Sequence, residues 1–251
     1  MTSRERLRKT LNHEDPGKLV VDIGSTLVSG INASALTRLR RALGLEDRPV
    51  KVHEPFQVLG EIEEDVRQAL GVDIVPVCSP YNMFGFKNEN WKPWKLNDGT
   101  EVLIGGDFAY KTDAAGNIFA YPKGDTSAHP SVKMPSGGFY FDNIIRQELI
   151  DEDKLNARTD FADDFNVFSD EELRHIEETA DYYYRNTGYG LNGGNFIAGF
   201  GDFAPLPGPG LINPKGIRSP EEWLVAHYTV PQYIKEVYEF QADVAMLQLK
   251  T

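Results

Sequence analysis

The chain has 251 residues, of which 41% are hydrophobic and 25% charged, and these values are ordinary for a globular protein. Its net charge of −12 argues against a nucleic-acid or anionic-membrane binder, because both partners attract positive surfaces. No apolar run reaches the roughly 20 residues that span a bilayer, and the single cysteine, Cys78, excludes an intrachain disulfide and a multi-cysteine metal site.

The first predicted element is a helix over residues 3–11. Thr2 and Glu5 stand at the spacing of a capping box, in which each side chain binds the backbone N–H of the other residue. Residues 1–6 lack the apolar core of a signal peptide. Together with the single thiol, this favours a reducing compartment, and we expect a cytoplasmic protein.

A short buried strand is predicted over residues 19–23, where the run is almost wholly apolar. Asp22 interrupts that run, and Ser25 and Thr26 follow it. A carboxylate and two hydroxyls at the exit of a strand are candidates for facing a pocket. The alternative is a hydrogen-bonded aspartate with a structural role.

Helical spacing returns over residues 36–43 and again over residues 59–70, and each run is followed by a glycine. Residues 72–77 then predict a second strand. Cys78 and Ser79 stand at its exit. Ser79 is a second candidate for the pocket, whereas a buried, inert thiol is the expected state of Cys78.

Turn sequences change the pattern between residues 91 and 122. Asn-Asp-Gly at residues 97–99 and a longer turn at 113–117 separate short β-prone runs. We expect a small antiparallel β insertion here. The acidic segment at residues 151–164 lacks the ligand spacing of a calcium-binding loop, and we expect an exposed connector with a short helix.

Three helices are predicted in the second half, over residues 169–188, over 219–228 and from 231 onward. Strands that alternate with long helices are typical of a parallel α/β architecture. The predicted parallel strands are too few to close an eight-stranded barrel. We therefore expect an incomplete α/β domain.

A glycine- and proline-rich stretch follows the first of these helices, over residues 189–210. Glycines at the end of a strand allow another backbone or a ligand to approach closely. Asn192, Asn195 and Asp202 are the polar side chains in this stretch. They are candidates for binding a ligand, and a packing corner without a ligand is the alternative.

Common catalytic motifs are missing. The sequence contains no phosphate-binding P-loop, no Gly-x-Ser-x-Gly and no His-Glu-x-x-His. The five histidines have no metal-binding spacing, so no metal ligand is predicted. The residues alone do not name a reaction.

Several segments, in the same order along the chain, carry a resemblance to a known family. They are residues 1–6 with 11–16, then 20–26, 70–75, 134–142 and 206–210. On these segments the chain resembles the N-terminal part of the uroporphyrinogen decarboxylase superfamily, and within it the branch of cobalamin (corrinoid)-dependent methyltransferases. We identify one such domain over residues 1–251, with the β insertion at 91–122 inside it.

The resemblance implies a TIM-type (β/α)8 barrel of which this chain forms an incomplete N-terminal portion. It implies a methyltransferase that moves a methyl group between a corrinoid on a partner protein and a small acceptor or donor, with zinc as a further cofactor. The family's zinc ligands, a His-x-Cys motif and a later cysteine, are absent from this sequence. The residues expected to bind substrate or corrinoid are Asp22, Ser25, Thr26, Ser79, Asn192, Asn195 and Asp202, and no catalytic residue is assigned.

Two other functions remain open. The first is a uroporphyrinogen decarboxylase of porphyrin biosynthesis with a diverged site, which is disfavoured because residues 21–26 lack the arginines that would bind the substrate's carboxylates. The second is a non-catalytic fragment or one half of a split enzyme, completed by a second chain or by a homo-oligomer.

Overall fold

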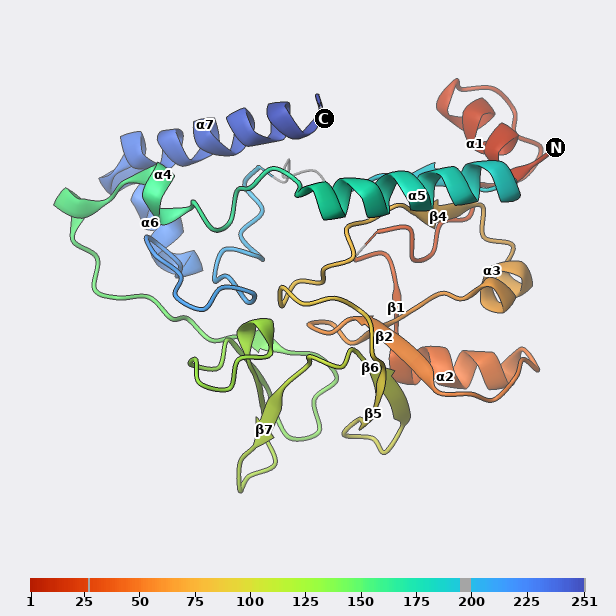
Figure 1. Cartoon of the computed structure of the whole chain (residues 1–251), viewed down its shortest axis with the longest axis horizontal. Helices are drawn as coiled ribbons and strands as arrows, with labels where there is room; N and C mark the ends of the chain where they lie inside the picture. The colour runs from red at the N-terminus through yellow and green to blue at the C-terminus, as the bar shows by residue number, and fades with distance from the viewer. Residues whose placement is uncertain (27, 195–199, 251) are drawn as a thin grey trace.

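The computed structural model describes residues 1–26, 28–194 and 200–250 (Figure 1). The fold is mixed α/β with several sheets, and the described residues form no closed barrel. The helices are α1 (Ser3–Leu11), α2 (Ala33–Ala42), α3 (Glu64–Leu70), α4 (Ala157–Asp160), α5 (Asp170–Asn186), α6 (Pro220–Thr229) and α7 (Pro231–Gln248). The strands are β1 (Ile31–Asn32), β2 (Val50–Glu54), β3 (Leu59–Gly60), β4 (Ile74–Pro76), β5 (Lys92–Lys95), β6 (Glu101–Ile104), β7 (Tyr110–Thr112), β8 (Ile118–Ala120), β9 (Val132–Met134), β10 (Asp142–Asn143) and β11 (Gly190–Asn192).

Local capping signals place the helix starts. The predicted capping box at Thr2 is confirmed for α1, and the structure has a second box at Ser169 for α5. Ser219 caps α6, which carries a proline in its first turn. The prediction for residues 59–70 was wrong in part, because Leu59 and Gly60 pair with β2 and the helix starts later. No helix among the described residues is long and apolar enough to cross a membrane.

The larger sheet has the order β1-β3-β2-β6-β5, and the second has the order β10-β9-β8-β7. The hairpins predicted within residues 91–122 are both present, as β5–β6 and β7–β8. They lie in different sheets. Strands from outside that range complete both sheets, since β6 pairs in parallel with β2 and β8 pairs with β9.

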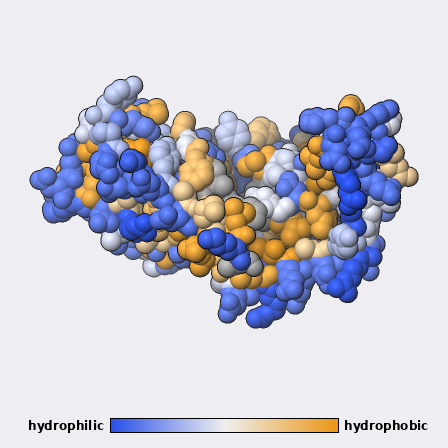
Figure 2. Space-filling model, turned by 90° about the horizontal axis from the view of Figure 1, so that it is seen from above, coloured by the Kyte–Doolittle hydropathy of each residue, from blue (hydrophilic) through white to orange (hydrophobic). Residues whose placement is uncertain are grey.

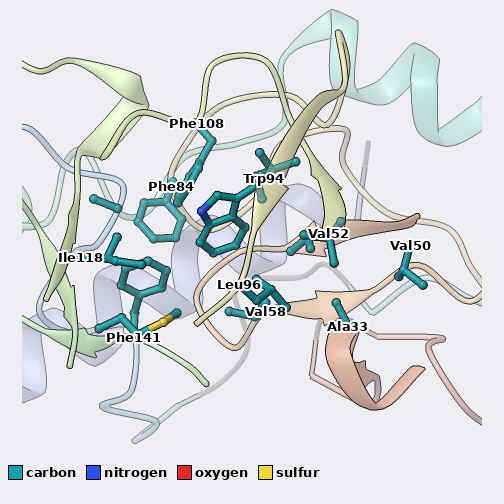
Figure 3. Packing of buried hydrophobic residues seen from close by; sticks show 14 of the residues in the cluster. Ala33, Val50, Val52, Val58, Phe84, Trp94, Leu96, Phe108, Ile118 and Phe141 are labelled. Atoms are coloured by element: carbon teal, nitrogen blue, oxygen red, sulfur yellow. The ribbon is translucent and has the colours of Figure 1, made fainter. Parts of the chain in front are cut away.

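A core of aromatic and branched side chains fills the space between these two sheets (Figure 3). Val52 and Trp94 come from the larger sheet and Ile118 from the second, while Phe84 and Phe108 come from connecting segments. The Phe84 and Phe108 rings meet edge to face at 6.0 Å. Such pairs add to the stabilisation that apolar burial supplies.

A second hydrophobic cluster holds α4, α6 and α7 together, at the far end of the molecule from α1 (Figure 1). Phe161, Trp223 and Val237 are among its buried members. Arg218 lies completely buried beside them and binds both carboxylate oxygens of Asp164. The acidic segment is therefore not simply an exposed connector, because part of it packs here.

The strand predicted over residues 19–23 was wrong. Val21 makes only two hydrogen bonds toward β4: its carbonyl accepts from Asp73 N at 2.8 Å, and its N–H donates to the Asp73 carboxylate at 3.1 Å. The Val21 N–H thus donates to the Asp73 side chain where a strand would donate to a backbone carbonyl, and residues 19–23 form no hydrogen-bonded ladder with β4. Leu19, which the pattern placed in a buried strand, is 85% exposed.

Candidate functional site

The candidate site lies at the carboxyl ends of β4 and β11, which pair in parallel with Pro76 opposite Asn192. The ladder continues past β4, because Val77 N donates to Asn192 O at 2.9 Å. Gly190 lets α1 pack against β11: a Cβ atom there would lie 2.4 Å from the Leu7 side chain. Carboxyl ends of parallel strands are where α/β folds gather functional groups.

Two arginines of α1 hold this strand pair in place. Arg4 donates through its guanidinium to the carbonyl oxygens of Tyr189 and Thr187, both at 3.1 Å, near the carboxyl end of α5. A cation there also complements the helix dipole. Arg6 forms an ion pair with Asp73, whose side chain is buried. These contacts fix β11 and the residue before β4.

Three of the predicted site residues form one hydrogen-bonded chain. Ser25 Oγ donates to Asp22 Oδ2 at 2.6 Å and accepts from Asn192 Nδ2 at 3.0 Å. Ser25 is fully buried, whereas Asp22 is exposed and Asn192 is half-buried. The buried hydroxyl thus joins an exposed carboxylate to the amide at the end of β11. We call these three residues the polar chain.

A tight loop sets the geometry of the polar chain. Gly24 has a φ of +81°, and a Cβ atom there would lie 2.6 Å from Ile62. Thr26 Oγ1 accepts from the N–H of Ser29 at 3.1 Å, and its own N–H donates to Ser29 Oγ at 3.0 Å. The Thr26 hydroxyl therefore stabilises the loop, and its methyl group faces Gly194.

A pocket of about 520 Å³ opens beside these strand ends, and Gly24 and Pro76 form part of its wall. We call it the polar pocket. Its polar side chains include His53, Arg67, Ser79, Lys87, Glu171 and His175. They come from β2, α3, the segment after β4, and α5, and these elements lie in the right half of Figure 1.

His53 is a titratable group of this pocket that burial affects. Burial lowers the pKa of His53 below its ordinary value, and a contact with the Gly60 backbone opposes the shift. The imidazole is therefore neutral at neutral pH. Asn88 Nδ2 donates to the His53 carbonyl at 2.7 Å and holds this part of β2 against the segment after β4.

Charges gather at the mouth of the pocket. Lys87 forms an ion pair with Glu171, and the Tyr81 hydroxyl donates to the same carboxylate at 3.1 Å. The hydrogen bonds from Lys87 and then Tyr81 lower the pKa of Glu171 below its ordinary value. Ser79 Oγ donates to Glu172 Oε1 at 2.8 Å, so its hydroxyl is tied to the first turn of α5.

The other predicted site residues are distributed as follows. Ser79 lines the polar pocket, next to the polar chain. Asp202 lines a different cleft, where its carboxylate accepts from Ala204 N at 2.9 Å. Asn195 lies outside the described residues. The structure thus brings Asp22, Ser25, Thr26 and Asn192 together, and it does not bring Asp202 to them.

Sequence reasoning missed His53, Lys87, Glu171 and His175. None of these residues belongs to a local motif, and they meet only through the tertiary packing of β2, α5 and the segment after β4 around the pocket. Within the described ranges, no three His, Cys, Asp or Glu side chains are grouped so as to hold a metal ion. The zinc that the resemblance implies is therefore assigned to no described residue.

Glu54, the neighbour of His53, gives a testable pH dependence. Its carboxylate is fully buried and accepts from the N–H groups of Phe56 and Gln57 at 2.9 and 2.7 Å. Burial raises the pKa of Glu54 from 4.5 to about 7. The native state therefore binds the proton more tightly than the unfolded state does. This contribution to stability is complete below pH 4.5 and is lost as the pH rises to about 7.

We expect Glu54→Gln to remove this loss. The wild type should lose stability between pH 4.5 and pH 8 and the variant should not. The difference in the free energy of unfolding, variant minus wild type, should therefore grow by roughly 2 to 3 kcal/mol over this range, at up to about 1.4 kcal/mol per pH unit. Urea unfolding at a series of pH values measures it. Glu101→Gln, at an exposed position of β6, removes an equal charge as the control. Parallel curves for wild type and Glu54→Gln would contradict the expectation.

Comparison with known proteins gave no relative. No model of a protein family, no curated protein and no solved structure matched the chain.

Proposed function

We propose that this chain is a methyltransferase of the uroporphyrinogen decarboxylase superfamily, which moves a methyl group between a corrinoid on a partner protein and a small acceptor or donor. In this proposal the described residues are the first part of a TIM-type barrel. A second chain or a second copy completes the site. The assignment to that family comes from the sequence segments that resemble it.

The polar chain at the ends of two parallel strands is the observation that carries the proposal. Asp22, Ser25 and Asn192 come from two segments 167 residues apart and meet at the strand ends, where barrel enzymes place their substrates. The polar pocket opens beside them and contains a neutral imidazole.

The proposed step is a displacement at the methyl carbon. A methylcorrinoid on the partner protein would be held beside the polar chain by Asp22, Ser25 and Asn192, and it would supply the methyl group that the acceptor takes up. In this proposal the described residues bind and orient the reactants, and they speed the reaction by holding the reacting atoms in the right geometry. His53 can accept the proton that an alcohol or thiol acceptor releases, because its imidazole is neutral.

The decarboxylase alternative fits the pocket less well. A porphyrinogen with many carboxylates requires several bidentate arginines. Arg67 is the one arginine among the described residues that line the polar pocket, and Glu61, Glu89 and Glu171 line it too. Acidic side chains in that number oppose a polyanionic substrate.

Methylcobalamin tests the proposal directly. Equilibrium dialysis measures its binding, and the absorbance of cob(I)alamin reports methyl transfer to 2-mercaptoethanol without oxygen. We expect saturable binding, weakened about tenfold in Asn192→Ala, since a hydrogen bond from the Asn192 amide to the ligand would be worth roughly 1 to 1.5 kcal/mol. Asn186→Ala is the matched control, because the Asn186 side chain is exposed on α5 and donates to the Tyr182 carbonyl of the same helix.

Two results would contradict the proposal. Absence of both binding and transfer would favour a non-catalytic protein. Conversion of uroporphyrinogen to coproporphyrinogen, without methyl transfer, would favour the decarboxylase.

A further inference from the structure

A second cleft, of about 590 Å³, lies on the other side of the segment that follows β4. Tyr81, Met83 and Gly85 of that segment form one wall, and α7 forms another. Aromatic side chains line much of it, namely Tyr81, Phe161, Phe165, Phe203, Trp223 and Tyr238. We call it the aromatic cleft. In Figure 2, hydrophobic residues gather in the middle of the face seen from above, between two more hydrophilic ends.

Gln241 on α7 is the unusual residue of the aromatic cleft. It is only 8% exposed and lines the cleft, yet its side-chain amide makes no hydrogen bond within the part of the chain that the structure describes. Its neighbours on the same face, Val237 and Val244, are buried and apolar. The amide atoms are not sealed from solvent, and among the described residues they have no partner, so they are free to bind a polar group of a ligand in the cleft.

Two loops that line the cleft pack backbone against backbone. A Cβ atom on Gly210 would lie 2.7 Å from the Met83 carbonyl oxygen, so only glycine lets these two loops touch. Arg146 holds the same loop by donating to the carbonyls of Leu211, at 2.6 Å, and of Gly208. The walls are therefore fixed by contacts of their own before any ligand binds.

The charges at the rim disfavour an anion. Asp163 and Asp202 are exposed carboxylates of the lining, whereas Lys123 is the one basic residue among the described lining residues. The carbon chain of Lys123 lies against Gly85, within 3.2 Å of the place a Cβ atom would take. Asp164 is already paired with Arg218. The excess of carboxylates repels negatively charged ligands. The contacts that remain favourable are those with the aromatic rings and with the Gln241 amide.

We propose that the aromatic cleft is a binding site for a neutral, planar aromatic molecule that carries one uncharged hydrogen-bonding group, an amide or a phenol. The rings of the cleft stack on the aromatic part. Gln241 binds the polar group, with its carbonyl as acceptor and its NH₂ as donor. This site is separate from the polar pocket and does not depend on the methyl-transfer proposal.

Benzamide is the probe, and benzoate is its anionic counterpart of the same shape. In ¹H–¹⁵N spectra of the labelled full chain, benzamide should shift the indole signal of Trp223 and the side-chain NH₂ signals of Gln241, and the shifts should saturate. Benzoate should bind at least about fivefold more weakly. Gln241→Met should weaken benzamide binding about tenfold, whereas Gln232→Met, at an exposed position of α7, should leave it unchanged.

A measurement on the wild-type protein guards against a variant that fails to fold. Intermolecular nuclear Overhauser contacts should join the benzamide ring to the Trp223 indole. Absent or unsaturable shifts, equal binding of benzoate, or full affinity in folded Gln241→Met would each overturn the proposal.

Discussion

Arg218→Met is expected to lower the free energy of unfolding by about 3 to 5 kcal/mol, the range for breaking a buried ion pair by removing one partner. Arg218 is completely buried. Its guanidinium donates to both oxygens of Asp164 at 2.8 and 2.9 Å and to the Asp160 carbonyl at 2.8 Å. It also lies 4.4 Å above the centre of the Phe161 ring. The variant leaves the carboxylate and the carbonyl without these donors, and methionine cannot replace them.

Urea unfolding followed by circular dichroism measures this effect. Arg185→Met removes an exposed pair with Asp181 one turn away on α5, and we expect a change below about 0.5 kcal/mol. The double variant Arg218→Met with Asp164→Asn should lose less than the sum of the single losses, because the second change removes an unpaired charge. Additive losses, or a small loss in Arg218→Met alone, would show that the pair does not hold this cluster together.

Arginine contacts of this kind explain part of what the sequence could not predict. The basic residues near the N-terminus have the pattern of solvated helix faces, yet Arg4 and Arg6 bind backbone and carboxylate groups of distant segments. Their partners lie 185 and 67 residues away. Periodicity within one helix carries no information about such partners, since it reports only which side chains share a face.

Helix starts were predictable for the opposite reason. The bonds of the boxes at Thr2 and Ser169 join residues three apart, so the sequence contains both partners. Strands depend on partners from elsewhere in the chain. Residues 19–23 have the composition of a strand, but Asp73 uses its side chain where a ladder would need a carbonyl. The α/β class was predicted, and the division of the hairpins between two sheets was not.

The residues of the candidate site also fall into those that a local sequence pattern indicates and those that only tertiary packing brings together. Asp22, Ser25 and Asn192 each stand at or near the end of an apolar run, and this pattern made them candidates. For Asn192 the run is the strand β11, whereas residues 19–23 form no strand and Ser25 reaches Asn192 from a loop. His53 was not predictable, because its site position follows from the pairing of β2 with β3 and β6. Glu171 lines the pocket from the first turn of α5, where it binds Lys87 and Tyr81 of the segment after β4. A residue on the middle of a strand or on a helix surface becomes a site residue through tertiary packing alone.

Phe108→Ala should lower the free energy of unfolding by about 3 to 5 kcal/mol, the usual loss for a phenylalanine removed from a packed core. Phe108 is 1% exposed and lies between the two sheets (Figure 3). Its ring centre lies 5.1 Å from that of Trp94 and 6.3 Å from that of Phe141. The variant therefore loses apolar burial and leaves a cavity, because the surrounding rings are held by two different sheets and cannot close together.

Two further variants distinguish the destabilisation caused by a cavity from that caused by the loss of buried apolar surface. Phe108→Leu keeps most of the apolar volume and should lose about 1 to 2 kcal/mol, whereas Phe139→Ala, at a 51% exposed position, should lose less than about 0.5 kcal/mol. Urea unfolding at constant pH gives all three values. If Phe108→Ala lost no more than Phe108→Leu, the sheets would be able to collapse onto the smaller side chain. The two sheets would then move relative to each other, and the polar pocket, which takes His53 from β2, would not have the fixed geometry that its proposed role requires.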